Sequence, residues 1–173
     1  GYSGVRECLL ERLCEMINAR VLPRIPEEGS VGASGDLTPL SYVAATLSGE
    51  REATWRGRVV PSAEALAPAG IPPFTLAPKE SLAIMNGTSV MTALACVAWA
   101  RAERLTRLAT AITAIVVDVI HGNRAHFDPR IFDLKPHPGQ KLCAEWIRGD
   151  LEMIDGAEIP TPARLQDRYS VRC

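Results

Sequence analysis

Residues 88–120, TSVMTALACVAWARAERLTRLATAITAIVVDVI, decide the fold class. Apolar residues recur along them at helical spacing, and Thr88 can cap the start of a helix. The pattern predicts one helix of about thirty residues. Four charged residues divide it into two apolar halves: Arg101, Glu103, Arg104 and Arg107. Because each half is too short to cross a bilayer, we expect a core helix and no membrane span.

Helical patterns also cover much of the remaining sequence, at residues 1–20, 39–48, 79–85 and 139–153. One β-hairpin is expected over residues 53–60, turning at Arg56-Gly57, inside a proline-rich excursion at residues 50–78. The last twenty residues are expected to be extended. The sequence therefore predicts a mainly α fold with one small β element, and residues 1–173 as a single segment.

The composition is that of an average soluble globular protein, with 47% hydrophobic residues, 23% charged residues and a net charge of -1. This balance gives no reason to expect a nucleic acid partner. Five cysteines lie scattered in mostly apolar stretches, which is typical of buried thiols in a reducing compartment, so we expect a cytoplasmic protein. Both ends of the chain stop within patterned sequence, which indicates a central fragment of a larger protein.

Residues 26–35, PEEGSVGASG, form a glycine-rich stretch ahead of a predicted helix. A phosphate-binding loop would need a strand before it and a lysine after the last glycine, where Asp36 stands. A hydrolase nucleophile elbow, Gly-x-Ser-x-Gly, would need a glycine at that same position. Both alternatives therefore fail, whereas a plain glycine-rich entry into the helix would explain an isolated Ala-Ser-Gly triplet, because such triplets are common.

Internal cyclisation is a further interpretation of this stretch. The amide nitrogen of Gly35 would attack the carbonyl carbon of Ala33, and loss of two waters would leave Ser34 as a dehydroalanine in an imidazolone ring. Glycine offers an unhindered amide nitrogen, serine can eliminate water to an exocyclic methylene, and alanine leaves room for closure. The triplet thus has the composition that such a ring requires.

Four blocks of sequence resemble, in order, blocks of the aromatic amino acid ammonia-lyases and aminomutases. They are residues 25–40 IPEEGSVGASGDLTPL, 79–88 KESLAIMNGT, 135–140 KPHPGQ and 166–173 QDRYSVRC. Together they span nearly the whole chain, which resembles the central part of a histidine, phenylalanine or tyrosine ammonia-lyase. The resemblance implies a bundle of long helices, a homotetramer, and a 4-methylidene-imidazol-5-one (MIO) electrophile formed from residues 33–35.

The same resemblance assigns roles to eight residues. They are the ring-forming and catalytic Ala33, Ser34 and Gly35, the neighbouring Asp36, which would assist ring closure, the catalytic Tyr169, and the substrate-binding Asn86, Gln166 and Arg172. The arginine offers a planar fork for the substrate carboxylate, and the two amides can orient substrate without adding charge. The tyrosine can donate a hydrogen bond to developing negative charge or act as an acid/base group.

The activity implied is non-oxidative elimination of ammonia from phenylalanine, tyrosine or histidine to give an arylacrylate. Residues 86–92 favour the phenylalanine or tyrosine branch. No pyridoxal phosphate is expected, because no lysine lies in a suitable motif, and no metal, because His121 and His126 lie five residues apart. Two alternatives stay open: an aminomutase that returns ammonia to the β-carbon, and an inactive helical oligomerisation fragment in which the ring does not form. The fragment alone is expected to be inactive, because the family's sites combine residues from several subunits.

Overall fold

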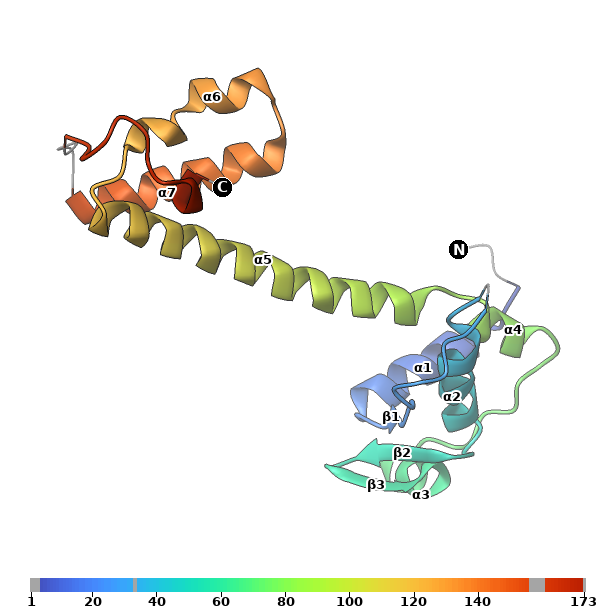
Figure 1. Ribbon diagram of the computed structural model, residues 1–173. Helices are drawn as coiled ribbons and strands as arrows, with labels where there is room; N and C mark the ends of the chain where they lie inside the picture. The colour runs from blue at the N-terminus through green and yellow to red at the C-terminus, as the bar shows by residue number, and fades with distance from the viewer. Residues whose placement is uncertain (1–3, 33, 156–160, 173) are drawn as a thin grey trace. The chain divides into compact units, whose positions relative to one another are not determined.

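The structure is a computed structural model that describes residues 4–32, 34–155 and 161–172 (Figure 1). It divides into two compact units, Gly1–Cys96 (unit 1) and Val97–Cys173 (unit 2). The helix α5, Ser89–Val119, confirms the predicted long helix and contributes residues to both units. The mainly α fold class is confirmed as well. The sequence does not predict the division into units, because no linker-like composition marks it.

Unit 1 begins with the amphipathic helix α1, Glu7–Asn18, which confirms the first predicted helix. The short apolar helix α2, Leu37–Leu47, follows the glycine-rich stretch and ends before Gly49, whose φ of 78° lies in the left-handed region. The sequence predicts a helix over residues 39–48, but α2 begins two residues earlier, with Asp36 in the N-cap position.

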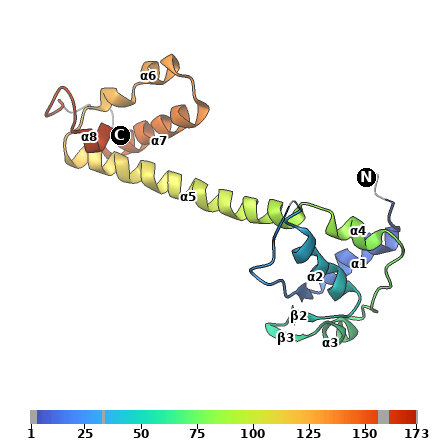
Figure 2. The same ribbon diagram turned by 45° about the vertical axis from the view of Figure 1, so that its right-hand side comes forward.

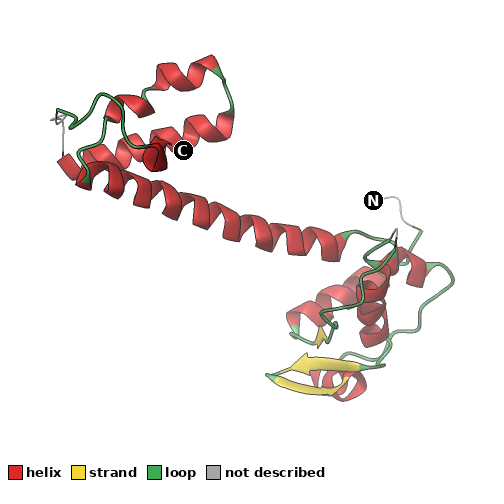
Figure 3. Ribbon diagram, viewed as in Figure 1, coloured by secondary structure: helices red, strands yellow, loops and turns green. Residues whose placement is uncertain are grey.

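The predicted hairpin is present within the proline-rich excursion (Figure 3). Strand β2, Glu52–Trp55, pairs antiparallel with β3, Arg58–Pro61, and the two residues of the turn have φ values of 49° and 75°. Positive φ at both positions matches the twist of the flanking strands. A third strand, β1, Leu22–Pro23, pairs with the other edge of β2. Its two residues are too few to show an alternating pattern in the sequence.

Three short helical elements complete unit 1: α3, Ser62–Leu66, the 3₁₀ helix η1, Ala67–Ala69, and α4, Glu80–Met85. The sequence predicts only α4, because the other two are too short to show a helical period. The buried core of the unit draws on the helices and the sheet: Leu9, Met16, Val21, Leu47, Ala53, Ala65, Leu66 and Ile71. Cysteines are absent from this core. The expectation of buried thiols is wrong for Cys8, Cys14 and Cys96, which are exposed.

Glu80, the first residue of α4, is a buried carboxylate that ties this helix to the start of α1. Its side chain is 2% exposed. It accepts hydrogen bonds from the backbone N–H of Arg6 at 3.1 Å, from Arg6 Nε at 2.9 Å and Nη2 at 2.7 Å, and from the backbone N–H of Ala77 at 2.7 Å. These bonds, that of the Arg6 side chain above all, lower the pKa of Glu80 to about 2. The start of α4 is therefore fixed.

Unit 2 contains the rest of α5 and the segments that fold against its end (Figure 2). They are the 3₁₀ helix η2, Arg124–Phe127, and the helices α6, Pro129–Leu134, α7, Pro138–Asp155, and α8, Tyr169–Arg172. Helix α7 confirms the helix predicted at residues 139–153, whereas η2 and α6 lie in a stretch with no predicted helix. The side chain of Asp128 accepts a hydrogen bond from Arg130 N–H and so caps α6, a signal that Asp128-Pro129 carries in the sequence.

The core of unit 2 is small. Ala114 and Val117 of α5 pack against Ile147 and Leu151 of α7. Val171 packs against this cluster as a partly buried residue. That contact explains why the chain forms the helical turn α8 where the sequence predicts an extended segment: the apolar side chain is anchored and its N–H donates to the carbonyl of Arg168 at 3.0 Å.

Much of the apolar surface of α5 is exposed. The exposed side chains include Met91, Leu94, Trp99, Leu105, Leu108, Ile112 and Ile115. The helical stretch Glu80–Val119, taken as a whole, is long and apolar enough to cross a membrane by length and composition. The core helix of a soluble protein has the same length and composition.

Candidate active site

The glycine-rich stretch folds back on itself ahead of α2. Ser30 Oγ donates a hydrogen bond to the carbonyl oxygen of Gly35 at 2.7 Å, which closes the stretch into a loop. Gly32 has a φ of 76°, a conformation that side chains disfavour. Ala33 lies outside the described residues. The described backbone on both sides of it is bent.

Gly35 lies so close to Ser30 that a side chain here would displace the serine hydroxyl. A Cβ at this residue would lie 2.7 Å from Ser30 Oγ, closer than atoms of this kind approach one another. Glycine therefore leaves the Ser30 hydroxyl in place, and it also offers the unhindered amide nitrogen that cyclisation needs. The sequence predicts the second property and gives no sign of the first.

Asp36 is buried, and its carboxylate binds the first turn of α5. Oδ2 lies 3.0 Å from Val90 N and 3.2 Å from Met91 N, and Oδ1 lies 3.1 Å from Met91 N. These N–H groups are the ones that an N-cap side chain normally binds, and a negative charge at this end also favours the helix dipole. The sequence predicts Thr88 as the cap, but Asp36 caps these two N–H groups from the glycine-rich loop.

A cavity of about 380 Å³ lies beside this contact. Its lining includes Ser34, Gly35 and Asp36 from the loop, and Gly87, Thr88 and Val90 from the start of α5. Concave sites of a few hundred Å³ are of the size that binds small molecules. The structure thus brings three of the predicted site residues together around a cavity.

Asn86 ends α4 and directly precedes Gly87, which lines the cavity. Its side chain is exposed, and its backbone N–H donates to the carbonyl of Leu82 at 2.8 Å. Asn86 is not among the lining residues, so the structure places it next to the cavity along the chain and leaves its predicted contact with substrate untested.

The other three predicted site residues belong to unit 2. Gln166 is exposed, and Tyr169 at the start of α8 is 72% exposed. The side chain of Arg172 lies outside the described residues. Unit 2 therefore presents two of these side chains on its surface.

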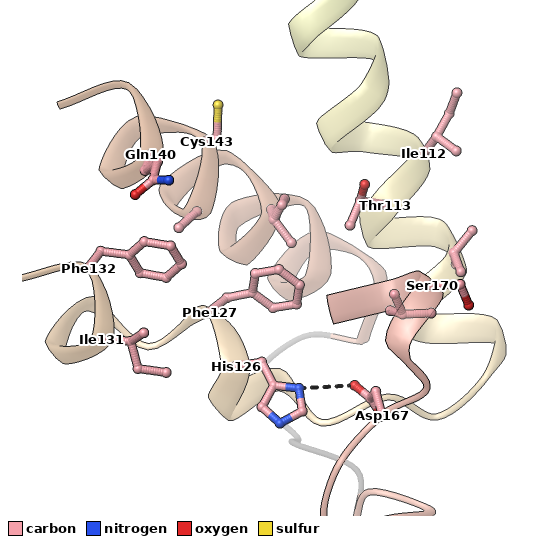
Figure 4. A pocket seen from close by; sticks show the side chains of 14 residues that line it. Ile112, Thr113, His126, Phe127, Ile131, Phe132, Gln140, Cys143, Asp167 and Ser170 are labelled. Carbon is pink, nitrogen blue, oxygen red and sulfur yellow. Dashed lines mark ion pairs between the residues drawn. The ribbon is translucent and has the colours of Figure 1, made fainter. Parts of the chain in front are cut away.

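A second cavity, of about 500 Å³, lies in unit 2 (Figure 4). Its wall is mostly apolar and includes Ile112, Phe127 and Phe132. At its edge, His126 Nδ1 lies 3.2 Å from Oδ2 of the buried Asp167 (Figure 4). In the sequence, His126 offers itself only as a metal ligand, and nothing marks Asp167 although it stands between the predicted site residues in QDRYS. Among the described residues, no three side chains of His, Cys, Asp or Glu form a group that could hold a metal ion.

Comparison with known proteins gives the family. The sequence profile described as "Aromatic amino acid lyase" matches residues 1–173. The chain belongs to the aromatic amino acid lyase family. A histidine ammonia-lyase of Sorangium cellulosum is 45% identical over 177 residues, which cover 100% of this chain and 34% of that protein. The chain spans about a third of the length of the curated lyases that it matches.

Solved structures of the family have the same fold. The histidine ammonia-lyase of Trypanosoma cruzi superimposes with a TM-score of 0.82 at 33% identity, over 99% of this chain and 31% of that chain. The phenylalanine aminomutase of Pantoea agglomerans gives a TM-score of 0.82 at 31% identity, over 99% and 36%. The predicted family and its enzymatic nature are thereby confirmed. The preference of residues 86–92 for phenylalanine or tyrosine gains no support from curated relatives that are named for histidine.

Proposed function

We propose that the chain is the central third of an ammonia-lyase that eliminates ammonia from an aromatic amino acid to give an arylacrylate. The observation that carries the proposal is the cavity at the start of α5, where Ser34 and Gly35 lie beside the buried Asp36. The curated relatives are named for histidine, which makes histidine the first substrate to test, before phenylalanine and tyrosine.

The ring that this chemistry requires is proposed to form from Ala33, Ser34 and Gly35. The loop fits such a ring in two ways. It favours glycine at position 35, because a Cβ there would lie 2.7 Å from Ser30 Oγ, and the same hydroxyl donates a hydrogen bond to the carbonyl oxygen of Gly35. Once formed, this MIO group supplies an electrophilic methylene and an electron sink, with no need for pyridoxal phosphate or a metal.

Asp36 is proposed to assist ring closure by holding the loop in place. Both carboxylate oxygens already accept N–H groups of α5, so the carboxylate fixes the triplet against the first turn of a long helix. A loop held at Asp36 and closed by Ser30 loses less conformational freedom when the ring forms. This role needs no proton transfer through Asp36.

Asn86, Gln166, Tyr169 and Arg172 are proposed to bind the substrate, with Tyr169 as the catalytic hydrogen-bond donor or acid/base group. Support comes from exposure: Tyr169 is 72% exposed and lies two residues after the buried Asp167. We propose that these residues complete the site in a homotetramer, where each site combines residues from several copies.

The exposed apolar side of α5 supports an assembly in which this helix is covered by protein and not by lipid. Arg101, Glu103, Arg104 and Arg107 lie in the middle of the helix, where charges in a bilayer would be costly. We therefore propose that other helices of the full protein and its copies cover α5, and that the protein has no membrane or nucleic acid partner. A cytoplasmic location fits the free cysteines among the described residues, because thiols persist in a reducing compartment.

The test uses the full-length protein and intact mass. We expect the wild type to weigh less than its sequence by two water molecules, and Ser34→Ala to show no such deficit and no activity. Ser41→Ala in α2 is the matched control, because Ser41 Oγ bonds only locally to the carbonyl of Thr38, so the mass deficit and activity should persist. A wild type with its full sequence mass would contradict the proposal and favour the inactive helical module.

The product decides between the lyase and a second candidate, an aminomutase, which the structural likeness to the phenylalanine aminomutase of Pantoea agglomerans favours. The wild type is incubated separately with histidine, phenylalanine and tyrosine. A lyase gives an arylacrylate, seen by its ultraviolet absorbance, together with free ammonia. A β-amino acid product would assign the aminomutase reaction to the same site.

A further inference from the structure

We propose that Asp167 and His126 are positioning residues, which hold residues 166–172 in the arrangement that the reaction needs. The inference rests on the proposed function, because it concerns the segment that carries Gln166, Tyr169 and Arg172. Neither Asp167 nor His126 has to touch substrate for this role.

Asp167 is buried within an exposed segment. Its side chain is 5% exposed, whereas residues 163–166 and 168–170 on either side are exposed. Oδ2 accepts a hydrogen bond from the backbone N–H of Asn123 at 2.9 Å. A buried carboxylate is costly unless it is partnered, and here the partners lie 41 to 44 residues away along the chain. The contact therefore fixes a distant segment at the turn that follows α5.

Two further hydrogen bonds join the same two regions. Asn123 Nδ2 donates to the carbonyl of Leu165 at 3.0 Å, and Ala163 N–H donates to the carbonyl of His121 at 3.0 Å. On the other side of Tyr169, Val171 packs against the core of unit 2. The exposed Tyr169 thus stands between two anchors, the polar one at Asp167 and the apolar one at Val171.

His126 gives the carboxylate its second partner. It projects from η2 at the edge of the cavity in Figure 4, with Nδ1 3.2 Å from Asp167 Oδ2 and a side chain that is 30% exposed. Asp167 therefore receives one bond from a rigid backbone group and one contact from a side chain. Because the backbone bond remains when His126 is removed, the histidine should contribute less to positioning than the aspartate does.

Three variants of the full-length protein separate these contributions. Asp167→Ala removes both contacts, Asp167→Asn keeps an acceptor for Asn123 N–H but loses the charge that faces His126, and His126→Ala removes the imidazole. We expect kcat/KM per MIO-containing site to fall about ten- to hundredfold in Asp167→Ala, and about two- to tenfold in the other two. The mass deficit of two waters should persist in all three, because the ring forms in unit 1.

Hydrogen exchange of backbone amides gives a readout that does not depend on activity. Exchange within residues 161–172 and at Asn123 should become faster in Asp167→Ala, while the core helices stay protected. Asp128→Asn is the matched control in the same unit: asparagine caps a helix as well as aspartate does, and the bonds that it weakens are with the neighbouring, exposed Arg130. Exchange within residues 161–172, kcat and KM should therefore match the wild type.

Unchanged kcat and KM in a ring-containing Asp167→Ala would overturn the proposal. If that variant fails to fold, His126→Ala decides, and wild-type activity together with wild-type exchange in this variant would overturn it as well. If the wild type has no lyase or aminomutase activity, the proposed function fails and exchange alone decides the structural part. Faster exchange confined to the two joined regions then supports the positioning role, and unchanged exchange refutes it.

Discussion

Units 1 and 2 both use a buried aspartate to hold a segment with predicted site residues, but they support it with cores of different size. In unit 1, Asp36 binds the first turn of α5, and the core of the unit has eight described buried apolar residues. In unit 2, Asp167 binds the turn after α5, and the core has four. Where apolar burial is small, polar contacts carry more of the positioning. Loss of a polar contact in unit 2 should therefore disorder a segment while the unit stays folded. Loss of one in unit 1 should reduce local order and the stability of the unit together.

Glu80 tests the unit 1 side of this comparison and should give the largest effect on stability. Its folded-state pKa is lowered from 4.5 to about 2, so its contribution is fully present above pH 4.5 and is lost as the pH falls toward 2. Glu80→Gln puts an amide N–H₂ among four N–H donors and should destabilise the protein at neutral pH. When the pH is lowered from 7 to 2, the thermal unfolding temperature should fall less for the variant than for the wild type.

The control for Glu80 is an exposed ion pair in the same unit. Arg24 Nη1 lies 2.8 Å from Glu52 Oε2, with side chains 59% and 56% exposed, so solvent screens the pair. Glu52→Gln should leave unfolding near that of the wild type. A Glu52→Gln effect as large as that of Glu80→Gln would mean that burial does not determine the contribution of these carboxylates.

Asp36→Ala should give the second largest effect. It leaves Val90 and Met91 N–H without their acceptor at the start of α5, which should cost about 2 to 3 kcal/mol. Asp36→Asn retains a capping oxygen and should cost less than about 1 kcal/mol. Chemical denaturation measures both. If Asp36→Asn keeps the two-water mass deficit, ring closure needs the cap and no proton transfer, whereas loss of the deficit in a stable Asp36→Asn would assign the carboxylate a chemical role.

The sequence predicts the long helix and the hairpin because each depends on local pattern: the 3.6-residue period and the turn at Arg56-Gly57. Ring formation by Ala-Ser-Gly, which also depends on local chemistry, stays a prediction. Prediction from the sequence fails where a residue far away along the chain takes the role that a neighbouring residue could have. Thr88 is a sound local cap, but a loop more than fifty residues earlier provides the carboxylate at Asp36. No local pattern reports a contact of that kind.

The same limit explains what is missed in unit 2. Asp167 lies between residues whose roles the family resemblance supplies, yet its partners at Asn123 and His126 become visible only in the folded chain. Short elements such as α6 and α8 escape because four to six residues show no period, although Asp128-Pro129 is a recognisable helix start.

Gly122 tests the unit 2 side of the comparison. A Cβ at this position would lie 3.1 Å from Val117 Cγ1 and 3.2 Å from Asp167 Oδ2, so Gly122→Ala should push the aspartate away from the turn. We expect a loss of about 1 to 2 kcal/mol in chemical denaturation, with faster amide exchange in residues 161–172. Gly149→Ala in α7 meets no atom within 4 Å and should be neutral or slightly stabilising. Equal effects of the two substitutions would show that Asp167 tolerates displacement.

Gly35→Ala should have the smallest effect on stability and the sharpest effect on chemistry. The new Cβ would displace Ser30 Oγ, whose exposed hydrogen bond is worth about 1 kcal/mol. The double variant Ser30→Ala/Gly35→Ala removes the clash, so a double-mutant cycle in chemical denaturation should recover part of that loss. Ring closure, measured by intact mass, should fail in both variants if an unhindered glycine nitrogen is essential. A double variant that regains the two-water deficit would instead mean that the clash with Ser30, and not the nucleophile, is what excludes alanine from the loop.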